Sequence, residues 1–272
     1  MPDSNDNVYK ASPSVFESVG IGSFAGMAEV VVNHPLWILK TRWQRFESFT
    51  LNPKIIYRGM VANATSMAPI TAVQIGLTRY LQTLFFNDAS QMTNYQHLGL
   101  AFSAGACSAI VSCPTEMVMT YQCQTKKTFY SSGAKLFQEN GIRALYAGFL
   151  ATALRDGMFA SCFLAVGPQL KNKISPYISS DAGASLLSGM VAGVGAAGAS
   201  QAIDTVKTVQ QSTKHPQNIA KTTRSLYAMD GAQAFFRGGL FRGARIVSAV
   251  TLISTLNEQL ENVIRGSQQG RW

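Results

Sequence analysis

Charged residues are scarce in this 272-residue chain, yet none of its segments is a clean run of about 20 apolar residues. Asp, Glu, Lys and Arg make up 14% of the sequence, roughly half the share that is usual in a soluble domain, while 47% of the residues are hydrophobic. This composition leaves two classes, a soluble protein of unusual composition and a membrane protein whose helices line something polar.

Cysteine pairs and metal-ligand spacings are also missing. The four cysteines form no CxxC pair and have no fellow ligands at metal spacing, which favours small buried side chains over a disulfide or a metal site: Cys107, Cys113, Cys123 and Cys162. The three histidines are dispersed and suggest no nucleophile–base pair, so we expect neither enzymatic activity nor a cofactor. The N-terminal MPDSNDNVYK predicts no cleaved signal.

The net charge of +9 is spread along the chain with no cluster of five or more basic residues. This distribution argues against nucleic acid as a partner. Anionic lipid and an anionic small-molecule substrate remain as partners that a positive protein would attract.

Six segments are long and apolar enough to be helices that cross, or nearly cross, a bilayer. They comprise residues 14–43, 60–84, 95–122, 149–170, 182–210 and 239–262. Charged residues such as Glu29, Asp204 and Arg242 interrupt them. A charge at that depth is costly unless it faces protein or a water-filled cavity, so these interruptions predict a polar path through the bundle.

Small residues recur four positions apart in the odd-numbered segments: Gly22 and Gly26, Ala101 and Gly105, Gly189 and Gly193. This spacing lets helix backbones approach one another closely. Its occurrence at corresponding places in three segments points to internal repetition.

A threefold repeat is the strongest organisational signal. Three related stretches end the odd segments: PLWILKTRWQ (35–44), PTEMVMTYQC (114–123) and AIDTVKTVQQ (202–211). Three others place an aromatic residue, one further residue and glycine just before an even segment: IIYRGM (55–60), NGIRALYAGF (140–149) and DGAQAFFRGG (230–239). We therefore divide the chain into helix–loop–helix repeats at 14–88, 89–175 and 176–264, with tails at 1–13 and 265–272.

These stretches resemble the mitochondrial carrier family, whose signature is P-x-[DE]-x-x-[KR]-x-[KR], a spacer, and [DE]-G-x-x-x-x-[YWF]-[KR]-G in each of three repeats. The third repeat lacks the proline and the last basic residue, the second lacks basic residues, and the first lacks the acid and has a shortened loop. The resemblance, over about residues 14–262, implies an all-α membrane protein. It implies six transmembrane helices in a pseudo-threefold bundle, short matrix helices, alternating access, and helix kinks at Pro35 and Pro114.

The resemblance also implies a matrix gate in which each signature acid pairs with the base on the next odd helix. Glu116 is expected to meet Lys207, and Asp204 is expected to meet Lys40. Two glutamines four residues beyond the bases fit the family's brace of these pairs, namely Gln44 and Gln211.

The third gate pair would join Trp37 to Met119, neither of which is charged. Losing one partner of a buried ion pair costs about 3–5 kcal/mol, whereas replacing both can be nearly neutral. We therefore expect a Trp–Met contact, with sulfur against the ring. The alternative is that Trp37 faces lipid or anchors at the membrane interface.

The family's cytoplasmic motif is more degraded. Of its ion pairs, at most one between Arg79 and either Glu258 or Glu261 survives. We hypothesise that this weak outer gate biases the resting state toward opening to the cytoplasm.

The family's solute contacts lie about seven residues past the glycine before each even helix, at Ser66, Arg155 and Arg245, and neighbouring positions add Gln74 and Asp156. We expect Arg155 and Asp156 to form a charge pair and Arg245 to be an unpaired cation, which makes the cavity positive and suits an anionic or zwitterionic solute. The Arg–acid pair resembles amino-acid carriers, whereas PLW resembles branches that carry nucleotides, NAD, FAD or folate. The two resemblances disagree, so the sequence does not decide whether the solute is an amino acid or a nucleotide.

Three glycines precede the even helices and are candidates to bind cardiolipin phosphates at helix N-termini: Gly59, Gly148 and Gly238. The resemblance implies a monomeric exchanger in the inner mitochondrial membrane, that of a host if an intracellular pathogen encodes it. The alternative is a carrier-derived adaptor that no longer transports, which the missing signature residues and the short first loop favour.

Overall fold

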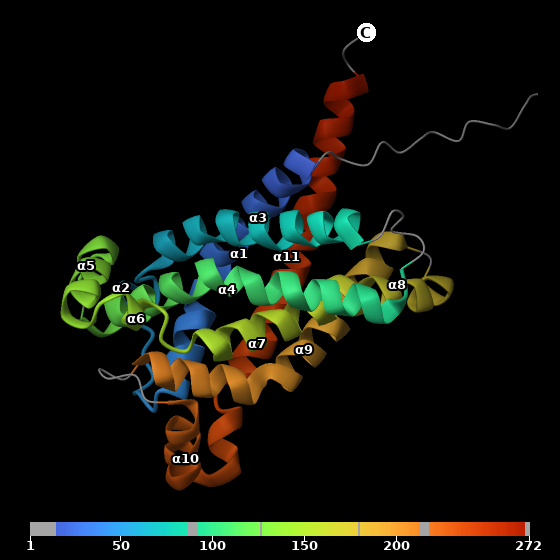
Figure 1. Ribbon diagram of the computed structural model, residues 1–272. Coiled ribbons are helices and arrows are strands. Elements are labelled where there is room, and N and C mark those ends of the chain that lie inside the picture. Colours follow the sequence, from blue (N-terminus) through green and yellow to red (C-terminus); the bar gives the residue numbers. More distant parts are fainter. Residues whose placement is uncertain (1–14, 86–91, 126, 179, 213–217, 270–272) are drawn as a thin grey trace, which may run out of the picture.

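The computed structural model describes residues 15–85, 92–125, 127–178, 180–212 and 218–269 (Figure 1). Within these ranges every regular element is a helix, so the all-α prediction is confirmed.

The long helices are α1 (Val15–Gln44), α3 (Met60–Phe85), α4 (Asn94–Thr125), α7 (Phe149–Ala160), α9 (Asp181–Ser212) and α11 (Gly239–Gln269). After α7 come a π-helical segment (Ser161–Val166), α8 (Gly167–Ile174) and a 3-10 turn (Ser175–Tyr177). The connecting elements are α2 (Pro53–Ile56), α5 (Phe129–Asn140), α6 (Ile142–Leu145), α10 (Ile219–Asp230) and a 3-10 segment (Gly231–Phe236).

The long helices form a closed ring. Each contacts its neighbour in chain order, from α1 through α3, α4, α7 and α9 to α11, and α11 returns to α1. Figure 1 shows α2, α5 and α6 at the C-terminal end of α4, with α8 at the opposite end. By length and composition, two of the described helices, α4 and α9, could cross a membrane.

Proline affects the fourth long segment differently from the others. Pro35, Pro69 and Pro114 lie inside continuous helices. Pro168 follows the π-helical segment at the start of α8. Proline has no N–H to donate to the preceding turn, and the widened turn lies where that bond is missing. The segment predicted as one helix is therefore divided at residue 161.

The same turn precedes the second, fourth and sixth helices of the ring, α3, α7 and α11, which we call the even helices. The odd helices are α1, α4 and α9. Gly59, Gly148 and Gly238 have φ values of 82°, 77° and 78°, a left-handed conformation that favours glycine. In every repeat a side chain of the odd helix contacts the carbonyl just before this glycine. The contacts join His34 Nε2 to Arg58 (3.0 Å), Cys113 Sγ to Ala147 (3.6 Å) and Gln201 Nε2 to Arg237 (2.9 Å).

The first repeat lacks the full connecting helix of the other two. Its α2 has 4 residues, whereas α5 and α10 have 12 each. In the second and third repeats the odd helix packs on a fully buried leucine of its own connecting helix, Leu136 or Leu226. In the first repeat, Ile56 of α2 and Phe129 from the start of α5 both pack against the apolar cluster that contains Ile38 of α1. The second repeat thus contributes a side chain of α5 to the apolar cluster of the first repeat, whose own connecting helix is short.

Close backbone approach explains the small-residue spacing on α4. A Cβ atom added at Gly105 would lie 2.5 Å from the backbone oxygen of Asp156 and from the Cβ of Ala160, both on α7. Only glycine permits this approach without movement of the α7 backbone.

We expect Gly105→Ala to lower the unfolding midpoint of the protein in detergent, because overpacking of this kind costs about 1–3 kcal/mol. Gly198→Ala on α9 is the matched control, since nothing lies within 4 Å of its added Cβ. The control should leave the midpoint unchanged or raise it slightly, because alanine favours a helix. Equal midpoints for the two variants would contradict the close α4–α7 contact.

Candidate functional site

Two largely buried ion pairs join α1, α4 and α9, the odd helices of the ring. Lys40 of α1 pairs with Asp204 of α9, and Lys207 of α9 pairs with Glu116 of α4. The Gln44 side-chain amide donates to Asp204 at 2.9 Å. These are the contacts that the signature spacing predicts. Because α1, α4 and α9 are each tied to another of the three, the pairs hold the C-terminal parts of these helices together.

Trp37 and Met119 lie where the third pair would be. They are 8% and 1% exposed and belong to one apolar cluster with Ile38. The Trp37 ring also stacks on His34, with 5.5 Å between ring centroids. Trp37 is therefore an interior residue, and the alternative of a lipid-facing tryptophan is wrong.

Gln211 differs from the prediction that it braces the second ion pair. Its amide donates to the Ala147 carbonyl at 3.3 Å and lies 3.9 Å from the Cys113 sulfur. That carbonyl just precedes the glycine turn into α7 and is available to accept, which explains why Gln211 turns to it. Among the described residues, Gln44 is thus the glutamine that contacts a gate acid.

Arg155 contacts carboxylates from three helices. It lies 2.6 Å from Asp156 on its own helix, 3.1 Å from Glu116 on α4 and 3.5 Å from Asp204 on α9. Asp156 in turn accepts a hydrogen bond from Ser112 at 2.8 Å. The sequence predicts the pair with Asp156, whereas the two longer-range contacts are found only in the structure.

Arg245 is not the unpaired cation that the sequence predicts. Its Nε and Nη2 donate to both oxygens of Glu29 on α1, at 3.2 and 3.3 Å. Asn33, one turn along α1, donates to the same carboxylate at 3.2 Å. The physical reason is that Glu29 is buried and requires a countercharge.

The two polar candidates of α3 make short-range or neighbouring contacts. Ser66 donates to the Asn63 carbonyl at 2.7 Å, and the Gln74 amide donates to Ser108 of α4 at 3.1 Å. Within the part of the chain that the structure describes, neither contacts Arg155 or Arg245 directly. The candidate solute residues therefore lie on three helices, α3, α7 and α11, each held by its own partners.

Arg242 is a buried cation to which the sequence assigns no partner. It donates to Ser200 at 2.7 Å and to Gln201 at 3.3 Å, and its guanidinium lies 4.0 Å from Asp204. Its place four residues after Gly238, one helical turn into α11, is the sequence signal that could have found it.

A family model described as "Mitochondrial carrier protein" matches residues 90–177 and 179–268. The chain belongs to the mitochondrial carrier family. Members of this family are transporters, so the chain is a carrier-type transporter and not an enzyme.

Named relatives match the carrier along most of its length. It is 26% identical to mitochondrial substrate carrier family protein X of Dictyostelium discoideum, over 86% of this chain and 87% of the relative. It is 28% identical to the mitochondrial carnitine carrier of Saccharomyces cerevisiae (87% and 83%) and 26% identical to mitochondrial glycine transporter B of Danio rerio (88% and 92%).

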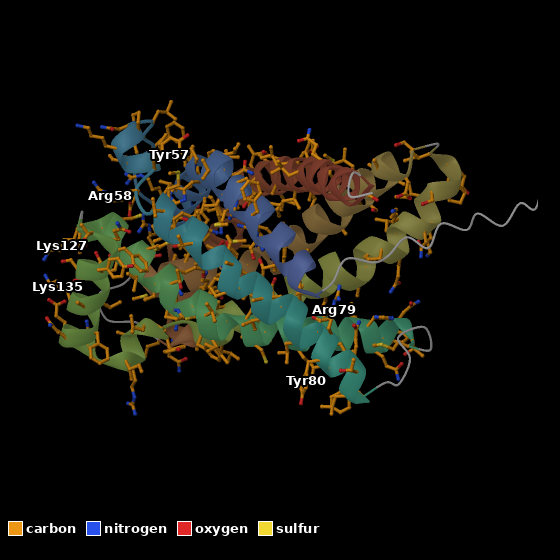
Figure 2. The ribbon with its side chains drawn as sticks, turned by 90° about the horizontal axis from the view of Figure 1, so that it is seen from above. Tyr57, Arg58, Arg79, Tyr80, Lys127 and Lys135 are labelled. Carbon is orange, nitrogen blue, oxygen red and sulfur yellow. The ribbon has the colours of Figure 1, made fainter. Side chains whose placement is uncertain are left out.

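The candidate cytoplasmic gate of the carrier is only partly described. Arg79 is an exposed residue toward the far end of α3, opposite the end where Figure 2 shows Arg58, Lys127 and Lys135. The side chains of Glu258 and Glu261 lie outside the described residues, so their pairing with Arg79 stays a prediction.

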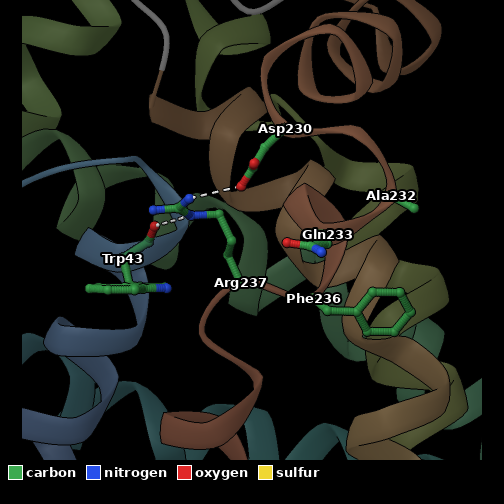
Figure 3. A pocket seen from close by; sticks show the side chains of 6 residues that line it. All are labelled: Trp43, Asp230, Ala232, Gln233, Phe236 and Arg237. Carbon is green, nitrogen blue, oxygen red and sulfur yellow. Dashed lines mark hydrogen bonds and ion pairs between the residues drawn. The ribbon is translucent and has the colours of Figure 1, made fainter.

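A pocket of about 460 Å³ lies away from the charged network, between the end of α1 and the segment after α10 (Figure 3). Arg237 crosses it, with its guanidinium 5.2 Å from the Trp43 ring centroid and 3.1 Å from Asp230. Gly238 follows directly. The pocket therefore borders one of the three glycine turns of the carrier.

We expect Trp37→Glu to lower the unfolding midpoint in detergent, because it places a carboxylate in an apolar cluster without a countercharge. Adding Met119→Lys should recover much of the loss, since a buried pair costs far less than one buried charge, which costs about 3–5 kcal/mol. Met119→Lys alone is the control and should also destabilise. If the double variant is no more stable than Trp37→Glu, the two positions do not face each other.

Proposed function

We propose that the carrier exchanges a zwitterionic or singly charged anionic metabolite of the amino-acid class across the inner mitochondrial membrane by alternating access. The observation that carries this proposal is a pair of arginines, Arg155 and Arg245, at equivalent places on α7 and α11, each held by an acidic residue. A guanidinium fixed in this way is suited to gripping a carboxylate.

The charge balance supports the amino-acid class over nucleotides. With Glu29 beside Arg245 and Asp156 beside Arg155, each candidate solute cation has an acidic partner. A polyphosphate would need uncompensated positive charge, whereas a zwitterion needs both signs. The relatives named as carriers of carnitine and glycine act on zwitterions.

We propose that the protein is a monomer whose six long segments all cross the membrane. The ring has a polar interior and an apolar exterior, the reverse of a soluble protein. Buried charged side chains include Glu29, Lys40, Asp204, Lys207 and Arg242. Each helix of the ring exposes large apolar side chains, for example Val32, Val61, Ile110, Leu150, Val191 and Leu240.

The end that carries the connecting elements faces the matrix in this proposal. Residues 45–59, 126–148 and 213–238 contain eleven Lys and Arg residues against three Asp and Glu residues. Short loops rich in Lys and Arg face the inner compartment of a membrane, which is the cytoplasm in bacteria and corresponds to the matrix in mitochondria. The Lys40–Asp204 and Lys207–Glu116 pairs then form the matrix gate, which Gln44 braces, and the cavity opens to the cytoplasm.

Membrane lipids are the second class of partner we propose. The glycine turns at Gly59, Gly148 and Gly238 precede α3, α7 and α11, and the first N–H groups of a helix suit a lipid phosphate. The pocket beside Gly238 adds a guanidinium, that of Arg237. Cardiolipin is the candidate lipid.

Exchange in liposomes separates the proposed transporter from the alternative of a non-transporting adaptor. We expect purified carrier to exchange at least one amino acid or quaternary-ammonium carboxylate from a panel that also contains nucleotides and keto acids. Exchange of nucleotides alone would contradict the amino-acid class. Failure to exchange any solute of the panel would favour the adaptor.

Arg245→Gln should lower kcat/KM for the exchanged solute by about tenfold, the size expected for losing one or two hydrogen bonds to a charged group. Lys135→Gln is the matched control, because it also removes one positive charge but from the exposed face of α5. Exchange at the wild-type rate in Arg245→Gln would remove Arg245 from the solute site.

A further inference from the structure

Arg155 has a contact that its equivalents on the other even helices lack. Its guanidinium reaches Glu116 at 3.1 Å and Asp204 at 3.5 Å, the acids of the two ion pairs proposed as the matrix gate. Arg245 reaches Glu29, and Ser66 reaches a backbone carbonyl. Of the three equivalent positions, Arg155 alone joins the solute site to the gate.

The gate has two ion pairs where the signature spacing allows three. With Trp37 and Met119 uncharged, two lysines face two carboxylates, and the α1–α4 side of the gate is an apolar contact. Arg155 enters from α7, which carries none of the gate lysines. It gives Glu116 a second positive neighbour beside Lys207 and Asp204 a third beside Lys40 and Arg242. Its side chain is only 13% exposed, so these interactions are weakly screened.

The donors of one guanidinium are limited. Arg155 uses Nε and Nη2 on Asp156, Nη2 on Glu116 and Nη1 on Asp204. A solute carboxylate that binds in a two-pronged fashion needs two neighbouring N–H groups of the five that the group has. The Nη1–Nη2 edge serves Asp204 and Glu116, so a solute carboxylate that takes this edge displaces both acids.

We propose that Arg155 serves as the third cation of the matrix gate and that a solute carboxylate opens the gate by competing for it. This inference rests on the proposed exchange function. In the empty carrier Arg155 bridges α4, α7 and α9, and the gate stays closed. In the loaded carrier the solute takes the guanidinium, so Glu116 and Asp204 each lose one positive neighbour.

The test compares Arg155→Gln with Arg245→Gln in liposomes loaded with the exchanged solute. Both variants should slow exchange. Only Arg155→Gln should raise the ratio of one-way efflux, measured without external solute, to exchange. We expect a rise of about tenfold, equivalent to the loss of one hydrogen bond to a charged group. The ratio corrects for weaker solute binding, because both fluxes need it.

A rescue experiment adds the double substitution Trp37→Glu and Met119→Lys to each of the two arginine variants. Trp37→Glu with Met119→Lys adds a gate ion pair that does not involve α7. In the Arg155→Gln background this addition should return the efflux ratio to near the wild-type value without restoring fast exchange. In the Arg245→Gln background it should leave the ratio unchanged. An efflux ratio in Arg155→Gln no higher than in Arg245→Gln would overturn the proposal.

If the wild-type carrier exchanges no solute, the proposed function fails, and unfolding in detergent still decides whether Arg155 stabilises the gate. The change in midpoint caused by Trp37→Glu with Met119→Lys should then be more favourable in the Arg155→Gln background than in the wild type. Equal shifts in the two backgrounds would show that Arg155 and the gate are independent and would overturn the bridge.

Discussion

The requirement that buried charges be paired governs the interior of this protein. Asp204, 1% exposed, has Lys40, Arg155 and Arg242 within 4.0 Å and accepts a hydrogen bond from Gln44. These partners come from α1, α7 and α11, so one carboxylate of α9 ties together helices from all three repeats. Each tie is strong because water does not screen it, and each is costly to lose for the same reason. The ring of helices is the frame that brings these groups within reach.

How far the sequence predicts this arrangement depends on the kind of contact. Helix limits follow from apolar length, and the pairs Lys40–Asp204 and Glu116–Lys207 are those that the resemblance to the carrier signature implies. The Glu29–Arg245 pair does not follow in this way, because neither residue belongs to the repeated signature that would relate one to the other. Gln211 was mispredicted for another reason, since a backbone carbonyl, which leaves no trace in the sequence, competes for its amide. The division of the fourth helix depends on where Pro168 removes a donor, which the apolar pattern does not reveal.

Equivalent positions in the three repeats meet the same geometric need with different chemistry. The carbonyl before each glycine turn is contacted by an imidazole, a thiol or an amide, from His34, Cys113 or Gln201. Trp37 and Met119 replace an ion pair with apolar packing, and Phe129 of α5 packs against the same apolar cluster. A ring of helices with a fixed turn tolerates such exchanges because each local need, a donor, a volume or a countercharge, has more than one solution. The signature therefore erodes at positions where a substitute fits.

Charge pairing also links the class of solute to the closure of the gate. When a carboxylate takes Arg155, the acids that it held, Asp156, Glu116 and Asp204, lose a positive neighbour. A simple anion brings no positive group with it, so binding it adds to the buried negative charge. A zwitterion brings an ammonium group that can lie beside one of these acids, which keeps the count of charges balanced while the partners change. Because an uncompensated buried charge costs several kcal/mol, of the order of the whole binding energy of a weakly bound metabolite, this balance favours the zwitterion. In the proposed cycle, the arginine that closes the gate therefore also selects the solute that opens it.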